Sequence, residues 1–291
     1  MTFVKVLVGV PTYNGSNRVD WLLQNISMRT EKDIDYKIVI CDDSENVNHQ
    51  KKIVEIVNKW KDLGLAVDII INEKNVGVPT SWNRIVKSQD SEHVILMNDD
   101  VLLAKDWLNT IVYFLDNNPN AGAVGHSFHI IDIEDVEILL SSSESVVKPR
   151  DPVTRSQYDI PNICCLETIP KRCLSPIGAI FGFRKDMYNM VGGFDEGYFA
   201  THDDLDFGTS LASHGYPSYM LQYPICWHMH SATVSSAPEA SYKIAMSEPG
   251  KRYINKWGGY VDVTFPRYMN KIPIQKVKWI CKDKEYENLS N

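Results

Sequence analysis

The chain has 291 residues, of which 44% are hydrophobic, so it can bury the core of one large domain or of one domain with an extension. A formal net charge of −7 argues against a nucleic-acid-binding surface as its main function. No apolar run approaches the ~20 residues that span a bilayer. The first residues, Met1 to Val6, are typical of a strand rather than of a signal peptide.

The six cysteines show no CxxC spacing, so we expect reduced thiols and a cytoplasmic protein. Cys164, Cys165 and Cys173 are close enough in sequence to suggest zinc. They lack a fourth spaced ligand, and we therefore do not predict a zinc site there.

Strands and helices alternate along the first part of the chain. Apolar runs predict strands at residues 4–10, 36–41, 67–71 and 93–97. Helical spacing of apolar residues predicts helices at residues 19–28, 49–63, 79–88 and 106–115. This alternation predicts an α/β fold with a largely parallel sheet flanked by helices.

The pattern weakens and then returns in the second part. We predict a strand at 122–128, long loops over a site at 129–172, a strand at 177–184, and a helical turn that ends before Gly192-Gly193. A helix should open at Asp203 or Asp204 and end near Ser213, followed by a strand at 218–222. We assign residues 1–234 to the main domain and residues 235–291 to a C-terminal extension without a periodic core.

Polar residues follow three of the predicted strands. They are Pro11-Thr12-Tyr13-Asn14, Asp42-Asp43 and Asn98-Asp99-Asp100. Ligands of open α/β sheets bind outside the carboxyl ends of the strands. An aromatic face and a carboxylate suit a nucleobase, and two adjacent acids suit a hard divalent cation that bridges a diphosphate. There is no GxGxxG after the first strand and no GxxxxGK[ST] motif, so the charge of the phosphates would be offset mainly by a metal.

These motifs resemble, in order, those of the inverting family-two glycosyltransferases of the GT-A fold, in particular the rhamnosyl- and galactofuranosyl-transferase-like members. The resemblance covers about the first 230 residues. The matching segments are Val10-Pro11-Thr12-Tyr13-Asn14, Val39-Ile40-Cys41-Asp42-Asp43-Ser44, Asn75-Val76-Gly77-Val78-Pro79-Thr80-Ser81-Trp82-Asn83, Asn98-Asp99-Asp100, Gly192-Gly193-Phe194-Asp195-Glu196, Asp203-Asp204-Leu205-Asp206 and Trp227-His228.

The resemblance implies a GT-A, Rossmann-like sheet, mixed but mainly parallel, and a nucleoside-diphosphate sugar as donor. It assigns Pro11, Thr12 and Tyr13 to the pocket for the nucleobase. It assigns Asp43 to the ring N–H of uracil or thymine, which implies a UDP or dTDP donor, and it places Asn83 near the nucleotide.

The resemblance also implies a metal site in the region of the family's DXD motif. The last acid, Asp100, would bind the metal, and Asp99 would bind the metal or the ribose. Asn98 stands where the family has an aspartate, and its amide would coordinate more weakly. His228 matches the histidine that completes the site in galactofuranosyl-type relatives. An imidazole among oxygen ligands favours Mn²⁺ over Mg²⁺.

Asp203 and Asp204 match the catalytic acids of the family. The resemblance makes Asp204 the general base, which takes the proton of the acceptor hydroxyl as its oxygen attacks the anomeric carbon from the side opposite the leaving group. Inversion at the anomeric carbon follows. The negative charge is favoured at a helix N-terminus.

Each residue has a simpler interpretation when it is taken alone. Asp43, Asp203 and Asp204 could be helix caps, His228 could be a structural histidine, and His230 is a rival ligand. Two other functions stay open. One is a catalytically inactive nucleotide-sugar-binding protein. The other is a sugar-1-phosphate nucleotidyltransferase, which should show a glycine- and arginine-rich loop after the first strand.

The acceptor is not encoded in any motif. We expect a hydroxyl on a glycan, glycolipid or other glycoconjugate. The lysines of the tail suggest peripheral contact with an anionic membrane surface, although a solvated charged face is the more common explanation of such a pattern. They are Lys276, Lys278, Lys282 and Lys284.

Overall fold

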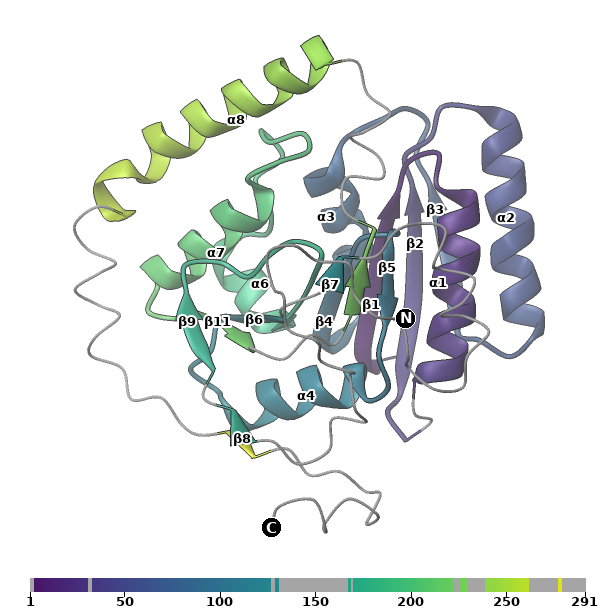
Figure 1. Cartoon of the computed structure of the whole chain (residues 1–291), viewed down its shortest axis with the longest axis horizontal. Coiled ribbons are helices and arrows are strands. Elements are labelled where there is room, and N and C mark those ends of the chain that lie inside the picture. The colour runs from purple at the N-terminus through teal and green to yellow at the C-terminus, as the bar shows by residue number, and fades with distance from the viewer. Residues whose placement is uncertain are drawn as a thin grey trace.

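The fold is built on a mixed, mainly parallel sheet (Figure 1). We describe a computed structural model over residues 3–30, 33–126, 129–130, 167–168, 170–221, 226–229, 239–261 and 277–278. In these ranges the main sheet has eight strands. In spatial order they are β3 (Val67–Ile71), β2 (Tyr36–Asp42), β1 (Val4–Thr12), β4 (Ser91–Met97), β10 (Ile180–Arg184), β6 (Ala123–His126), β11 (Ser218–Leu221) and β9 (Lys171–Cys173).

Strands β3, β2, β1 and β4 run parallel to one another, as the alternation of strands and helices predicts. Strand β10 is antiparallel to both of its neighbours, β4 and β6. Its amino end therefore lies at the same sheet edge as the carboxyl ends of β1, β2 and β4. The predicted fold class, mixed and mainly parallel, is confirmed.

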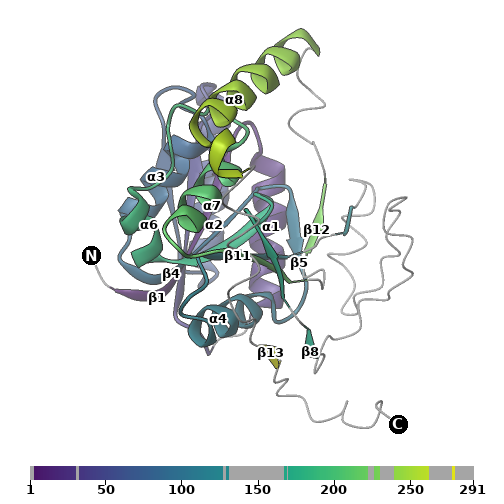
Figure 2. The same cartoon turned by 90° about the vertical axis from the view of Figure 1, so that its left-hand side faces the viewer.

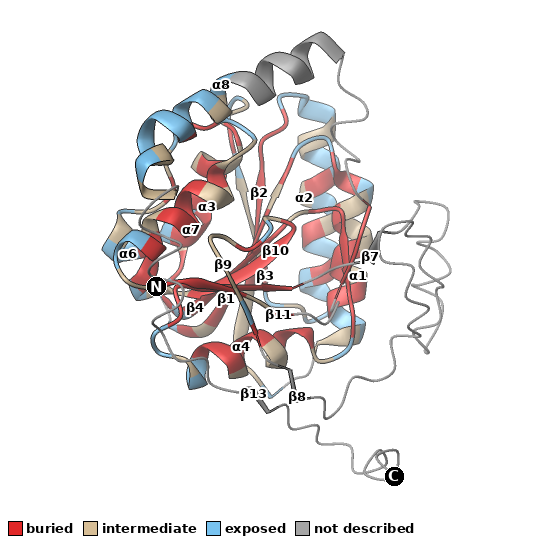
Figure 3. Ribbon diagram, turned by 60° about the vertical axis from the view of Figure 1, so that its left-hand side comes forward, coloured by how far each residue is buried: buried red, intermediate tan, exposed pale blue. Residues whose placement is uncertain are grey.

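Helices cover both faces of this sheet (Figures 1 and 3). On one face pack α1 (Ser16–Arg29), α2 (Val47–Asp62) and α4 (Trp107–Asn117). On the other face pack α3 (Val78–Ser88), α6 (Lys185–Val191) and α7 (Asp203–Ser213). Successive side chains of a strand point to opposite faces, so Val6 and Val8 enter the first core and Leu7 enters the second. A strand buried on both faces explains the continuous apolar run from Val4 to Val10.

A smaller sheet joins the chain after β4 to the distant His228. Its strand order is β5 (Val101–Leu103), β12 (Cys226–His228) and β7 (His129–Ile130). Helix α1 holds this sheet through Asn25, whose side chain accepts from the Leu103 N–H at 2.6 Å and donates to the Leu103 carbonyl at 3.3 Å. Strand β5 has three residues, too few for its pattern to be recognised in the sequence.

The described C-terminal residues form a helix and a short strand that the sequence pattern does not predict. Helix α8 (Glu239–Gly259) lies against α7 (Figures 1 and 2). It carries Pro249 and Gly250 in its middle, two residues that disfavour helix, so no helical pattern stands out. Strand β13 (Val277–Lys278) pairs antiparallel with β8 (Glu167–Thr168). The boundary proposed at residues 234 and 235 lies outside the described residues and stays a prediction.

The other predicted elements recur with small shifts of their ends. The strand predicted at 177–184 begins at Ile180, because the backbone of Gly178 turns toward α7 instead of pairing in the sheet. Most of the loop predicted at 129–172 lies outside the described residues, as do His230, Cys164 and Cys165.

Candidate functional site

Both acidic clusters of the sequence meet at one edge of the main sheet. The carboxyl ends of β1, β2 and β4 lie there, together with the amino end of β10. The Asn98 N–H donates to the Ala179 carbonyl at 3.0 Å, and next to Ala179 the Gly178 N–H donates to Asp204 at 2.7 Å. The strand end that carries Asn98-Asp99-Asp100 is thus linked through one short backbone segment to the first turn of α7.

Asp100 and His228 lie in direct contact although 128 positions separate them in sequence. His228 Nε2 is 3.0 Å from Asp100 Oδ1, and the two residues are only 5% and 7% exposed. The smaller sheet produces this contact, because His228 pairs with Val101 and the Met229 N–H donates to the Asp100 carbonyl at 2.8 Å. A buried carboxylate oxygen and an imidazole nitrogen of this kind suit a divalent cation such as Mn²⁺.

Asp99 is held by contacts within the protein. Arg18 donates to both of its carboxylate oxygens, from Nε at 3.0 Å and from an Nη at 2.9 Å, and the Thr12 hydroxyl donates at 2.5 Å. Burial raises the pKa of Asp99, while the Arg18 guanidinium and the Thr12 hydroxyl act in the opposite direction. The forked contact with Arg18 is the strong form of such a pair. Asp99 therefore has less capacity left for a metal than Asp100 has.

The turn after β1 fits closely over this pair. A Cβ atom built on Gly15 would overlap the Asp99 carboxylate and the Thr12 hydroxyl. The φ of Gly15 is −105°, a value open to any residue, so glycine is needed here for space and not for backbone conformation. Next to it, Asn14 has a positive φ of 52° and donates its N–H to the Ser44 hydroxyl.

Asp43, predicted to bind a nucleobase, also shapes the loop before α3. Its Oδ1 accepts from Asn72 Nδ2 at 2.9 Å and from the Val76 N–H at 2.8 Å, and its Oδ2 accepts from the Gly77 N–H at 2.8 Å. A carboxylate offers about four lone-pair sites. Three are used in these bonds, which leaves one on Oδ2 for a further donor.

Asn83, predicted to lie near the nucleotide, makes four hydrogen bonds within the protein. Its Nδ2 donates to the Phe194 carbonyl and to Glu196, and its Oδ1 accepts from Tyr188 and from the Phe194 N–H. The residue is 5% exposed. These bonds use the full capacity of an amide side chain. Asn83 thus holds the turn at Gly192-Gly193 in place, and its nearness to the donor stays a prediction.

Asp204, the predicted base, is fixed by backbone donors. The Gly178 N–H donates to one carboxylate oxygen and the Leu205 N–H to the other, each at 2.7 Å, while Ser175 donates to the Asp204 carbonyl. Each carboxylate oxygen keeps a lone pair that can take a proton. His202, which precedes the helix, has a φ of 67°, and strained backbone of this kind clusters at functional sites.

The two adjacent acids at the start of α7 are harder to ionise than free carboxylates. Burial, and next the charge of Asp204, raise the pKa of Asp203 to about 7. Burial also raises the pKa of Asp204. A carboxylate with a raised pKa is a stronger base, which is the property that proton abstraction near neutral pH requires.

The remaining predicted residues lie at the same edge. Pro11 and Thr12 end β1, where they pair with Cys41 and Asp42 of β2. Tyr13 follows and is 37% exposed, so its ring is accessible to a ligand.

Arg18 and Asn72 also belong to the site, through their contacts with Asp99 and Asp43, although no sequence motif predicts them. The only signal for Arg18 is a basic residue in the first turn of the helix that follows Pro11-Thr12-Tyr13-Asn14. That turn packs back on the strand ends, so Arg18 reaches Asp99.

A second group of possible metal ligands lies elsewhere. Among the described residues, Glu92, His93 and Asp116 form the one set of three or more such side chains close enough to share an ion. They lie at the amino end of β4, away from the candidate site. Asp116 there forms an ion pair with Lys5 at 3.0 Å and lies 2.7 Å from His93 Nε2, so it has partners within the protein.

Comparison with known proteins gives a family and a curated relative. Residues 7–189, more than half of the chain, match the family described as Glycosyl transferase family 2. The poly(ribitol-phosphate) β-N-acetylglucosaminyltransferase TarP of Staphylococcus aureus (strain N315) is 29% identical over 115 residues. That alignment covers 39% of this chain and 34% of TarP, so the chain spans about a third of the length of this relative.

Solved structures share the fold at low sequence identity. The mannosyltransferase PcManGT from Pyrobaculum calidifontis, in complex with GDP-Man and Mn²⁺, matches with a TM-score of 0.61 and 18% identity over 93% of this chain and 73% of its own. S. aureus TarS 1-349 in complex with UDP-GlcNAc matches with a TM-score of 0.53 and 16% identity over 89% of this chain and 76% of its own.

Proposed function

Because the chain belongs to glycosyl transferase family 2, we propose that it is a metal-dependent, inverting enzyme that transfers a hexose or deoxyhexose from a UDP- or dTDP-sugar to an acceptor hydroxyl. The observation that carries this proposal is the contact between Asp100 and His228 at the sheet edge that also bears Asp203-Asp204. Such a transfer requires groups that hold a metal and a carboxylate that accepts a proton. The residues proposed for these two roles lie at the same edge of the sheet.

The proposed cation is Mn²⁺ or, less well matched, Mg²⁺. Asp100 and His228 would hold it, and the diphosphate and water would supply the remaining ligands, as is usual for sites with few protein carboxylates. When bound, the ion offsets charge that develops on the departing diphosphate. Asp99, which is paired with Arg18, is assigned to hold the segment after β4 in place and to contact the ribose. PcManGT, a structural neighbour, is a complex with Mn²⁺, and this supports the choice of metal.

The proposed base is Asp204. Its two backbone donors fix the direction of the carboxylate, and its raised pKa favours proton uptake. It takes the proton from the acceptor hydroxyl while that oxygen bonds to the anomeric carbon and the bond to the nucleoside diphosphate breaks. General-base catalysis of this kind contributes about 10²–10⁴-fold. Asp203 is assigned to support Asp204 at the same helix end.

The proposed donor base is uracil or thymine. The remaining acceptor site on Asp43 Oδ2 suits the ring N–H of either base, and the accessible ring of Tyr13 suits stacking on its face. A structural neighbour, TarS, is a complex with UDP-GlcNAc, which supports a uridine donor. The neighbour bound to GDP-Man makes guanine the alternative to be tested.

For the acceptor we propose a glycan, glycolipid or other glycoconjugate. Within the described ranges, no helix combines the length and the apolar character needed to cross a membrane. Peripheral contact of the tail with an anionic surface, and a cytoplasmic setting in which Cys41 and Cys226 stay reduced, complete the proposal.

A binding and hydrolysis experiment tests the proposal. UDP-, dTDP- and GDP-sugars are compared by thermal shift with and without Mn²⁺, since a ligand at 100 times its Kd stabilises the folded state by about 2.7 kcal/mol. We expect stabilisation by a UDP- or dTDP-sugar that requires Mn²⁺, together with donor hydrolysis that Asp204→Asn removes. Binding without any hydrolysis would favour the inactive sugar-binding protein. Stabilisation by GDP-sugars alone would contradict the assignment of Asp43.

A further inference from the structure

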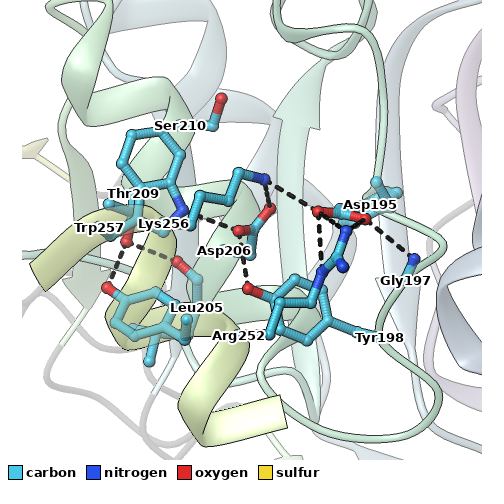
Figure 4. Close-up of polar contacts among 12 residues, drawn as sticks. Asp195, Gly197, Tyr198, Leu205, Asp206, Thr209, Ser210, Arg252, Lys256 and Trp257 are labelled. Atoms are coloured by element: carbon cyan, nitrogen blue, oxygen red, sulfur yellow. Dashed lines mark hydrogen bonds and ion pairs between the residues drawn. The ribbon is translucent and has the colours of Figure 1, made fainter. Parts of the chain in front are cut away.

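Asp206, the third acid of the Asp203-Asp204-Leu205-Asp206 segment, makes hydrogen bonds with side chains of α8 (Figure 4). It is 3% exposed. Its Oδ1 accepts from Trp257 Nε1 at 2.7 Å and from the Tyr198 hydroxyl at 3.1 Å, and its Oδ2 accepts from Lys256 Nζ at 2.9 Å. Two of these three donors come from α8.

A second carboxylate extends the contact to the loop before α7. Asp195 accepts from an Nη of Arg252 at 2.7 Å and from Lys256 Nζ at 3.1 Å, so Lys256 bridges Asp195 and Asp206. The Arg252 guanidinium also covers the ring of Tyr198, 5.3 Å from its centroid. Hydrogen bonds and ion pairs thus connect α8 both to α7 and to the loop before α7.

We call the contacts of α8 with α7 and the loop before it the α7–α8 junction. Hydrogen bonds between neutral groups also contribute to this junction. The hydroxyls of Thr209 on α7 and Tyr253 on α8 are 2.7 Å apart, and both residues are at most 9% exposed. Gly197 lies under Arg252, where a Cβ atom would overlap the guanidinium. The backbone of the loop before α7 therefore lies directly against the Arg252 guanidinium.

The junction acts on the turn that holds the proposed base. The Asp206 N–H donates to the His202 carbonyl at 2.8 Å, which closes the first turn of α7 around Asp203 and Asp204. A buried carboxylate that loses its donors is costly and must move toward solvent. Movement of Asp206 would turn the first turn of α7 and with it the Asp204 carboxylate.

We propose that Lys256 and Trp257 of α8 are positioning residues, which fix the direction of the Asp204 carboxylate through Asp206. The proposal rests on the proposed function, in which Asp204 is the base. It gives α8, which lies beyond the part of the chain that matches the family, a role in the transfer step. The proposed nucleotide contacts at Tyr13, Asp43 and Asp99 follow β1, β2 and β4, and the hydrogen bonds described for Asp43 and Asp99 do not involve α8. We therefore expect binding of the donor to depend much less on this junction than the transfer step does.

The test uses the full chain with Lys256→Met and Trp257→Phe combined, which removes both donors and keeps most of the side-chain volume. A displacement of about 1 Å at a reacting group can cost up to ~100-fold in rate, so we expect kcat to fall by about 10- to 100-fold while the KM for the donor changes by less than about twofold. The single variant Lys256→Arg, with Trp257 unchanged, should keep most of the kcat of the unaltered chain. Lys251→Met is the matched control, because Lys251 lies on the same helix, is 68% exposed and pairs with Glu248.

Hydrogen exchange supplies a second reading that does not depend on activity. The amides of Leu205 and Asp206 should lose protection in the double variant and keep it in Lys251→Met. If the double variant does not fold, Trp257→Phe alone is measured in the same two ways. An unchanged kcat, or unchanged protection of these amides, overturns the proposal. A third outcome is that the amides lose protection in the double variant while the unaltered chain transfers no sugar. The junction would then hold α7, and the proposed function would be wrong.

Discussion

At the scale of single residues, the neighbouring carboxylates Asp99 and Asp100 have different surroundings. Asp99 accepts from Arg18 and Thr12, and Asp100 faces His228. Adjacent carboxylates repel each other unless a cation intervenes. Here the Arg18 guanidinium offsets the charge of Asp99, and Asp100 is the residue that we propose binds the metal. The contact of Arg18 with both carboxylate oxygens of Asp99 thus gives the two adjacent acids different surroundings.

This division predicts unequal effects of substitution. Asp100→Ala removes a proposed direct ligand, so Mn²⁺-dependent donor binding should weaken by more than about 100-fold, beyond the 10- to 100-fold typical of residues that only support a ligand. Asn98→Ala should weaken it by about 10-fold or less, because an amide coordinates weakly at best. Titration of the donor with and without Mn²⁺ measures both. Equal and complete loss from the two variants would mean that the ligand assignment is wrong.

At the scale of elements, the first turn of α7 combines charge, burial and pH dependence. Burial raises the pKa of both Asp203 and Asp204, so the folded protein holds their protons more tightly than the unfolded chain. Their contribution to stability is therefore full below the ordinary aspartate pKa of about 3.9 and is lost as the pH rises through the raised values. The carboxylate form of Asp204, which we propose as the base, appears as the pH rises through its own raised pKa.

Activity and stability should therefore change in opposite directions with pH. We expect kcat to rise along an acid limb whose midpoint lies above 3.9, the value for an exposed aspartate, because burial raises the pKa of Asp204. The contribution of the pair to the free energy of unfolding should fall over the same range. The measurements are a pH profile of kcat at saturating Mn²⁺ and urea unfolding of the protein and of Asp203→Asn. A midpoint near 4 would contradict the argument.

The turn between β1 and α1 is a second element with a sharp prediction. Gly15→Ala should displace the Asp99 carboxylate, because the added Cβ has no room beside it. We expect a loss of about 1–3 kcal/mol in the free energy of unfolding, as for other overpacked sites, and weaker donor binding. Gly259→Ala is the control, since its Cβ would meet nothing within 4 Å. Chemical denaturation of both variants measures the difference, and equal stability would refute the close fit.

At the scale of the whole molecule, the site depends on contacts between distant parts of the chain. Strand β10 runs antiparallel between β4 and β6, so Gly178 and Ala179 connect the two acidic clusters. The smaller sheet brings His228 to Asp100. Helix α8 lies over α7 and supplies the donors for Asp206. Each of these connections joins segments far apart in sequence.

The sequence by itself determined the strands and helices of the first half and the family. Apolar periodicity is a local property, and motifs such as Pro11-Thr12-Tyr13-Asn14 and Asn98-Asp99-Asp100 stand directly after the strands that carry them. Their common edge follows from parallel strands alone. Helix α8 was not predicted, because Pro249 and Gly250 interrupt its helical pattern. Contacts with α7 supply the stabilisation that the helix propensity of its residues does not.

Only the tertiary structure decided how each side chain of the site is used. Asp43 and Asn83 bind backbone groups of neighbouring loops, and Arg18 neutralises Asp99. Hydrogen bonds depend on which donors the folded chain brings within about 3 Å, a quantity that no local pattern contains. The sequence therefore identified the chemical groups, and the packing of distant segments determined which of them remain available to a ligand.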